Sequence, residues 1–337
     1  MAPESTPPDG APGPLADAND DFDPTAFLEE DLDESTPLAA ELVANARRRL
    51  ALERSEFPPP AATRIITVAN QKGGVGKTTS TVNLAGALAM AGLNVLVVDN
   101  DPQGNASTAL GVEHQSGTPS VYDVLIDGVA LEEVIQPSGS IDGLKVAPAT
   151  IDLSGAEIEL VPLVARENRL RKAIDTYVKR EAAKGTRPDY IFIDCPPSLG
   201  LLTVNAFVAA REVLIPIQTE YYALEGLSQL LRNIELIRGH LNPQLHVSTI
   251  LLTMFDQRTK LSHQVEEEVR AHFPEQTLQT WIPRSVRISE APSYGQTVLT
   301  YDAGSTGALA YRAAGHEVAV RGAAQATPSP QGAEARQ

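Results

Sequence analysis

Short runs of consecutive apolar residues alternate with longer mixed stretches through the middle of the chain. Five runs predict buried strands because both of their faces would be apolar, at residues 64–70, 94–99, 190–194, 212–217 and 246–253. The stretches around them predict helices at residues 78–91, 166–183, 201–210, 222–240, 261–273 and 307–320. Apolar strands that alternate with helices are typical of an α/β fold, a doubly wound, mostly parallel sheet with helices on both faces.

The two ends of the chain lack this pattern. Residues 1–36 are mostly Pro, Ala, Asp and Glu, with too few large apolar side chains to offset the entropy of ordering, which predicts disorder. Residues 37–56 contain good helix formers but no clean apolar stripe, so they fit either a solvated helix or a helix that docks on a partner. The following "FPPPAAT" predicts a stiff linker. We therefore expect three regions, namely an acidic extension at 1–62, a folded domain at 63–322 and a disordered tail at 323–337.

Charge and cysteine content narrow the function. The net charge is −16, and residues 1–62, with 14 acidic and 4 basic side chains, contribute −10 of it. A contact with nucleic acid would therefore need a local basic patch, because the overall field repels it. Cys195 is the sole cysteine, which excludes a multi-cysteine metal site within one chain and fits a reducing cytoplasm. No apolar run approaches the ~20 residues that span a membrane, and the N-terminus lacks the apolar core of a signal peptide.

The stretch "NQKGGVGKTT", residues 70–79, joins the first predicted strand to the first predicted helix. Lys77 is placed to bridge the β- and γ-phosphates of a nucleotide, Thr78 to ligate Mg²⁺ and Thr79 to bond another phosphate. Backbone N–H groups can converge on phosphate oxygens at the start of the helix, and they come from Gly73, Gly74, Val75 and Gly76. A simple glycine turn between strand and helix is a poor alternative, because it leaves the Gly-Lys-Thr-Thr run unexplained.

This loop departs from the usual phosphate-binding pattern, G-x-x-x-x-G-K-[ST], in one position. Gln71 stands where that pattern has its first glycine, and a second lysine, Lys72, follows it. Lys77 already serves the nucleotide of its own chain, so the position of Lys72 needs a separate explanation.

Three carboxylates follow predicted strands. Asp99 and Asp101 end "VLVVDNDPQGN", and Asp194 ends the strand in "YIFIDCPPSLG". The carboxyl ends of parallel strands meet at one edge of a sheet, where ligands bind. These acids should therefore lie beside residues 70–79, which we call the glycine loop. Asp194 fits the Walker-B role of holding a Mg²⁺-bound water, and Asp101 is better placed than Asp99 to position an attacking water. For Asp99, a structural role at the strand end fits equally well.

Several motifs together resemble the ParA family of chromosome- and plasmid-partition ATPases, which are P-loop NTPases with a deviant Walker A loop. They are "KGGVGKTT", "VDNDPQGN", "IDCPPSLG", "LLTMFDQRTKLSHQV" and "IPRSVRISEAPSYGQTV", and the resemblance covers about residues 63–322. The last two are similar to the Soj-like chromosomal branch. The resemblance implies a cytoplasmic, nucleoid-associated bacterial ATPase with ATP and Mg²⁺ as ligands. It also implies an ATP-sandwich homodimer, nonspecific binding of double-stranded DNA, and hydrolysis stimulated by a ParB-like centromere-binding protein.

The resemblance also implies roles for particular residues. Lys72 would reach across the dimer to the partner's ATP, and Asp101 would be the carboxylate needed for hydrolysis. Pro283 and Ser285 would lie against the adenosine, although the family often has Asn at the position of Ser285. DNA would be contacted by Arg258 and Arg287, in a patch that three further residues could extend or could leave as ordinary surface charges: Lys260, Arg270 and Arg284.

Other functions fit the sequence less well. A MinD-like ATPase needs a basic amphipathic C-terminal helix, and the tail has two prolines and almost no large apolar residues. Iron proteins and anion-pump ATPases that share the loop need more cysteines. A structural nucleotide-dependent dimer would not need Asp101 and Asp194. Residues 1–62 are too short and acidic for a helix-turn-helix domain, but they could bind a polar or scaffold protein. A ParA-like ATPase that positions a non-chromosomal cargo remains an alternative.

Overall fold

The computed structural model describes residues 37–221 and 223–324 of the 337-residue chain. The chain divides into two compact units at the Arg47/Arg48 boundary, and the fold described below belongs to the larger unit. A helix, α1, occupies Pro37–Glu53, where the sequence predicts one at 37–56. The predicted disorder of residues 1–36 and of the tail beyond Ala324 falls outside the described residues.

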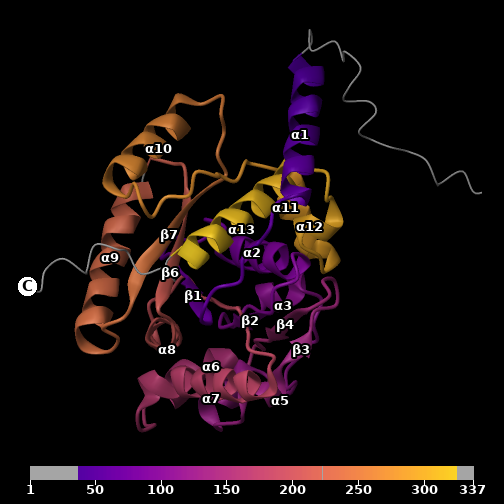
Figure 1. Cartoon of the computed structure of the whole chain (residues 1–337). Coiled ribbons are helices and arrows are strands. Elements are labelled where there is room, and N and C mark those ends of the chain that lie inside the picture. The colour runs from indigo at the N-terminus through magenta and orange to yellow at the C-terminus, as the bar shows by residue number, and fades with distance from the viewer. Residues whose placement is uncertain (1–36, 222, 325–337) are drawn as a thin grey trace, which may run out of the picture. The chain divides into compact units, whose positions relative to one another are not determined.

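A seven-stranded sheet forms the centre of the larger unit (Figure 1). The strand order is β3-β4-β2-β5-β1-β6-β7, and each neighbouring pair is parallel except β3 and β4, which are antiparallel. The mostly parallel α/β fold predicted from the sequence is therefore confirmed. From β1 to β7 the strands are Arg64–Val68, Val95–Asp99, Gln136–Pro137, Leu144–Ala147, Tyr190–Asp194, Glu212–Gln218 and His246–Thr253.

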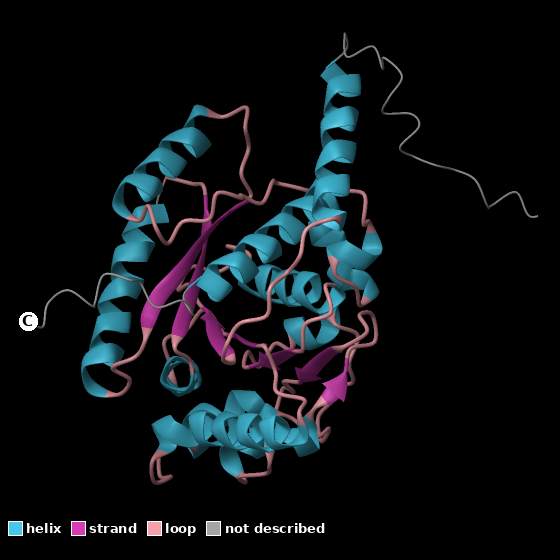
Figure 2. Cartoon of the chain, in the orientation of Figure 1, coloured by secondary structure: helices cyan, strands magenta, loops and turns pink. Residues whose placement is uncertain are grey.

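Successive side chains of the strands enter two separate cores, one on each face of the sheet. In β5, Ile191 and Ile193 belong to one core, whereas Tyr190 and Phe192 belong to the other. Both cores are apolar, which explains why the central strands read as uninterrupted apolar runs. Figure 2 shows the strands enclosed between the helices. The first core is covered by α7 (Arg169–Lys184), α8 (Leu201–Ala209), α9 (Ala223–His240) and α10 (Lys260–His272), and the second by α2 (Lys77–Met90) and α13 (Thr306–Ala324).

The sequence pattern missed the short elements. Strands β3 and β4 and the short helices have between two and seven residues, too few to show a strand or helix period. The missed helices are α3 (Asn105–Ala109), α4 (Val121–Ile126), α5 (Leu131–Val134), α6 (Leu153–Glu159), α11 (Val286–Glu290) and α12 (Val298–Tyr301), together with the 3-10 turn η3 (Ala291–Tyr294). The 3-10 turn η2 (Arg166–Asn168) lies within the helix predicted at residues 166–183.

The segment predicted as a linker packs on the folded domain instead. The Phe57 ring meets the His316 ring of α13 edge-on, with the centroids 5.2 Å apart. The carbonyl oxygen of the buried Pro60 accepts a hydrogen bond of 2.9 Å from Arg187 Nη2. At the other end of the domain, α13 continues to Ala324, two residues beyond the boundary expected at 322. Specific side-chain contacts, which proline-rich composition does not reveal, hold residues 57–63 in place.

A buried ion pair joins the amino ends of β1 and β6. Arg64 donates to Glu212 through Nε at 2.8 Å and through Nη2 at 2.6 Å, and its Nη1 donates to the Val318 carbonyl of α13 at 2.7 Å. Burial alone would raise the pKa of Glu212, but the hydrogen bond and charge of Arg64 outweigh it and lower that pKa. The pair thus ties two central strands to a helix at the sheet edge opposite the glycine loop.

Candidate nucleotide-binding site

A cavity of about 450 Å³ opens at the carboxyl ends of the central strands. These strands lie side by side in the order β2-β5-β1, so the segments that follow them meet at one place. The cavity is lined by Asp101 after β2 and by six residues of the glycine loop and the start of α2, namely Gly73, Gly74, Gly76, Lys77, Thr78 and Thr79. The structure therefore brings seven of the predicted residues to one cavity, whereas Val75, which was also predicted, does not line it.

The glycine loop leaves its cavity side open. A Cβ placed on Gly73 or Gly74 would meet nothing within 4 Å, so a ligand can approach the backbone there. Gly76 has a φ of 88° and forms the N-terminal cap of α2, a conformation that an L-residue adopts only with strain. The left-handed turn at Gly76 ends the loop where the helix begins, which directs the first N–H groups of α2 toward the cavity.

Lys77 supplies a cation at this position. Its side chain is buried, and its Nζ donates to the carbonyl oxygen of Lys72 at 3.3 Å. Burial lowers the pKa of Lys77, and the negative charges of Asp194 and Asp101 oppose that effect. Because Lys77 also lines the cavity, its ammonium group can contact an anion such as a phosphate bound there.

Asp194 is fully buried at the end of β5 and bonds to the start of α2. Its Oδ2 accepts from Thr78 Oγ1 at 2.7 Å, and its Oδ1 accepts from Thr81 Oγ1 at 3.0 Å. Burial and the nearby charge of Asp99 raise the pKa of Asp194. The neighbouring Cys195 is fully buried, as expected for a packed residue. Thr78 and Asp194, which the sequence predicts to hold Mg²⁺ directly and through a bound water, are in direct contact with each other.

Asp99 holds the loop that carries Asp101. Its Oδ2 accepts from the backbone N–H of Ser107 at 2.8 Å and from Ser107 Oγ at 2.7 Å, and its Oδ1 accepts from the Asp101 N–H at 3.2 Å. Asp101 in turn accepts at Oδ1 from the Gln103 N–H at 3.0 Å and lines the cavity. Of the two interpretations of Asp99, these bonds favour the structural one, and they leave Asp101 as the carboxylate beside the phosphate loop.

The side chain of Lys72 is directed away from its own cavity. Lys72 is absent from the residues that line it. Its Nζ instead forms an ion pair of 2.8 Å with Glu220 Oε2, in the turn after β6. Both side chains are about two-fifths exposed, so the ammonium group lies at the surface. This placement separates the roles of the two lysines of the loop.

The predicted adenosine contacts differ from the residues that line the cavity. Neither Pro283 nor Ser285 lines it; Met254 and Pro292 do. Pro283 lies close by, because it forms a bridge with Phe255, the residue after Met254. Met254 was not predicted from the sequence, although its place directly after β7, at the carboxyl end of a strand, was a usable signal. It has a φ of 52°, which is unusual for a non-glycine residue.

Four of the five residues predicted to bind DNA have exposed side chains. Arg258 and Arg287 are exposed, and each pairs with acids near it in the fold, Asp256 for Arg258 and Glu290 and Asp302 for Arg287. Lys260 and Arg284 are also exposed.

Arg270, the fifth of these residues, is mostly buried and bonded within its own subunit. Its guanidinium group donates to Glu266 and to the carbonyl oxygens of Leu278 and Gln279, and three-quarters of the side chain is buried. These bonds connect α10 to the loop that follows it. Arg270 is therefore a structural residue.

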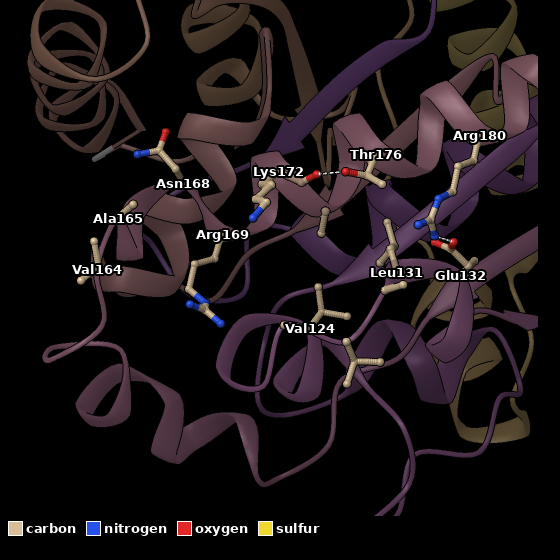
Figure 3. Close-up of a pocket in the computed structure, with 14 residues that line it drawn as sticks. Val124, Leu131, Glu132, Val164, Ala165, Asn168, Arg169, Lys172, Thr176 and Arg180 are labelled. Carbon is tan, nitrogen blue, oxygen red and sulfur yellow. Dashed lines mark hydrogen bonds and ion pairs between the residues drawn. The ribbon is translucent and has the colours of Figure 1, made fainter.

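A second cleft, of about 380 Å³, lies between α7 and the segment from α4 to α5 (Figure 3). Its arginines are engaged, because Arg169 donates to the carbonyl oxygens of Leu125 and Ile126, and Arg180 pairs with Glu132. The cleft contains no part of the glycine loop. The cavity beside Lys77 is therefore the candidate nucleotide site.

Two features are absent from the described residues, a cluster of metal-binding side chains and a membrane-spanning helix. Residues 37–221 and 223–324 contain no group of three or more His, Cys, Asp or Glu side chains suited to a metal ion. Within the same residues, no helix combines the length and apolarity needed to cross a membrane.

Known proteins resemble this chain over most of its length. A family model described as an AAA domain matches residues 63–247. Sporulation initiation inhibitor protein Soj of Bacillus subtilis is 52% identical over 259 residues, 77% of this chain and 99% of that protein. Chromosome partitioning protein ParA of Myxococcus xanthus is 49% identical over 275 residues, 82% and 94% of the two chains. The structure of cobyrinic acid a,c-diamide synthase from Mycobacterium smegmatis, with bound ATP analogue and magnesium, has a TM-score of 0.63 and 36% identity over 74% and 92%.

Proposed function

The chain belongs to the ParA/Soj family of chromosome-partitioning ATPases, and from this premise we propose that ATP controls its dimerisation and its binding to DNA. Two ATP-bound subunits form a sandwich dimer that binds double-stranded DNA without sequence preference. Hydrolysis, stimulated by a ParB-like protein at the origin region, returns the subunits to a state that releases DNA. Repeated release near the ParB-bound region moves that region across the nucleoid.

The position of Lys72 is the observation that carries this proposal. The phosphate loop holds one lysine, Lys77, in its own cavity and directs the other, Lys72, to the surface. A surface ammonium group attached to a phosphate loop can serve a second phosphate site only if that site belongs to another subunit. The Lys72 side chain therefore supports a dimer in which each subunit completes the nucleotide site of its partner.

The residues of the cavity fit ATP with magnesium. Open space borders Gly73 and Gly74, and the buried Lys77 provides the cation that a phosphate requires. Thr78 would hold the metal ion directly and Asp194 would hold a water bound to it, an arrangement compatible with their present contact of 2.7 Å. Magnesium, when bound, neutralises charge that develops on the phosphoryl group. Asp101, fixed beside the loop, would orient the attacking water.

The DNA surface would contact phosphates rather than bases, because a nonspecific binder gains its affinity from Arg and Lys beside the backbone. The exposed side chains of Arg258, Lys260, Arg284 and Arg287 supply such cations after β7 and in α11. One subunit offers few of them within a chain of net charge −16. A dimer doubles the contacts, so dimerisation would convert weak binding to strong binding.

The test compares full-length wild type, Lys72→Ala and Lys172→Ala, with magnesium and a non-hydrolysable ATP analogue. Lys172 is the matched control, because it is an exposed lysine of α7 that does not line the nucleotide cavity. Sedimentation should show wild type and Lys172→Ala shifting from monomer to dimer. Lys72→Ala should bind the analogue in a fluorescence titration and remain monomeric, because its own cavity is intact. A monomeric wild type, or a Lys72→Ala variant that dimerises as wild type does, would refute the proposal.

A further inference from the structure

The partner of Lys72 in the free subunit is Glu220, a residue that the nucleotide site does not use. Lys72 Nζ and Glu220 Oε2 are 2.8 Å apart. Glu220 does not line the nucleotide cavity. Its carboxylate accepts a second hydrogen bond at Oε1, from the Gln218 side-chain amide. The carboxylate is thus oriented from one side by Gln218 and holds Lys72 on the other.

The backbones at both ends of this ion pair are anchored to the end of β6. The Lys72 N–H donates to Asn70 Oδ1 at 3.0 Å, and Asn70 Nδ2 donates to the Pro216 carbonyl at 2.8 Å. On the other side, the Glu220 N–H donates to the carbonyl oxygen of Gln218, the last residue of β6, at 2.8 Å. Because both backbones are fixed, only the two side chains need to move for the ion pair to open.

We propose that Glu220 is a positioning residue that holds Lys72 in the free subunit and must release it before the dimer forms. This inference rests on the proposed function, because it assumes that Lys72 binds the partner's phosphate. A lysine has one ammonium group, and the carboxylate of Glu220 competes with the incoming phosphate for it. The free subunit therefore dimerises only when two ATP-bound sites together outcompete two carboxylates, which keeps it monomeric at low ATP occupancy.

The size of the effect follows from the exposure of the pair. With side chains that are 40% and 44% exposed, the pair is screened by solvent and easily opened. Exposed ion pairs of this kind change an equilibrium by roughly 1.4- to 5-fold each, so two of them in a dimer change its dissociation constant by roughly 2- to 30-fold. An effect of this size raises the ATP occupancy that dimerisation needs, but it does not prevent the dimer from forming.

The experiment measures the dimer dissociation constant of the full-length chain with magnesium and the non-hydrolysable analogue. Glu220→Gln should dimerise more tightly than wild type by roughly 2- to 30-fold, and Glu220→Asp, which keeps the charge, should lie nearer wild type. Glu235→Gln is the matched control, because Glu235 also forms an exposed ion pair, with Arg238 on α9. This control should leave the dissociation constant unchanged.

A double variant separates this inference from a merely structural role. In the Lys72→Ala background, which should be monomeric, Glu220→Gln should not restore the dimer, because there is no ammonium group to release. The difference between wild type and Glu220→Gln should also shrink at high salt, which screens an exposed pair. Unchanged or weaker dimerisation of Glu220→Gln, or an effect that persists without Lys72, would overturn the inference. Normal dimerisation of Lys72→Ala alone would instead contradict the proposed function.

Discussion

Gly104 sets the turn that carries Asp101. Its φ is 63°, and its N–H donates to the Asp101 carbonyl at 2.9 Å. A Cβ at this position would lie 2.9 Å from His114 Nδ1 and 3.2 Å from the Ala149 carbonyl oxygen, so an added methyl group would displace the turn. The position of Asp101 thus depends on a residue that does not face the nucleotide.

We predict that Gly104→Ala lowers ATP turnover by on the order of 100-fold, since small displacements of a catalytic group are that costly. It should also lower the free energy of unfolding by about 1–2 kcal/mol, the cost of a left-handed L-residue. Gly143→Ala is the control, with a φ of 78° and nothing within 4 Å of its Cβ. Steady-state ATPase assays and urea denaturation should show similar destabilisation but normal turnover for Gly143→Ala. Equal loss of turnover in both variants would contradict the prediction.

Residues at strand ends were predictable because one rule of parallel sheets locates them. Lys77 and Asp101 line one cavity, and Asp194 bonds to Thr78 in its wall, since β1, β5 and β2 end side by side. Met254 and Pro292 were missed for a physical reason: the first reaches the cavity through a left-handed backbone, and the second through a single 3-10 turn. Neither feature leaves a pattern in the order of apolar and polar residues.

At the scale of secondary-structure elements, the Arg64–Glu212 pair joins β1, β6 and α13. We predict that Glu212→Gln lowers the free energy of unfolding by about 3–5 kcal/mol at pH 7, because it leaves a buried guanidinium charge unpaired. Urea denaturation measures this change. Glu235→Gln, which removes an exposed carboxylate from α9, should change stability by less than about 1 kcal/mol.

The same pair predicts a dependence on pH. The pKa of Glu212 is lower in the folded state than in the unfolded state. Its contribution to the free energy of unfolding is therefore complete above the unfolded-state pKa of ~4.3, and it is lost as the pH falls through the folded-state pKa. The stability difference between wild type and Glu212→Gln should therefore be constant from about pH 7 to 5 and shrink at about pH 4 and below. A difference that does not change with pH would show that charge pairing is not its source.

Element length decided what could be predicted at this scale. The long elements follow the apolar pattern closely; β5 and β7 match the predicted residues 190–194 and 246–253 in full. The antiparallel β3 pairs with β4 through only two residues, Gln136 and Pro137, and no periodicity exists in a segment of that length. Such elements form because neighbouring parts of the fold position them.

At the scale of the whole molecule, residues 57–63 belong to the domain by their contacts. We predict that the variant lacking residues 1–54 has a free energy of unfolding about 1–2 kcal/mol higher than the variant lacking residues 1–62. The shorter deletion keeps the contact of the partly buried Phe57 ring with His316 and the hydrogen bond between Pro60 and Arg187. Urea denaturation should show this difference, and both variants should hydrolyse ATP. Equal stability of the two variants would mean that the segment contributes nothing.

We also predict that the charge-reversal variant Arg258→Glu with Arg287→Glu loses DNA binding and retains ATP binding. Each phosphate contact contributes about −0.9 to the slope of log affinity against log salt, so wild-type binding should weaken steeply as salt rises. Gel-shift titrations at several salt concentrations measure both effects. The control Arg238→Glu reverses an exposed charge on α9 and should bind as wild type does. DNA retention by the double variant, or a flat salt response, would reject this surface.

The pairing of β1 also has a consequence for how the protein is made. Ile66 of β1 pairs with Phe192 of β5 on one side and with Glu212 of β6 on the other. During synthesis, the phosphate loop therefore leaves the ribosome long before either neighbour of its strand exists. Such distant pairings are slow to form. The first functional motif to be translated therefore waits for its neighbouring strands, and the cavity beside it is complete only after Pro292 has emerged.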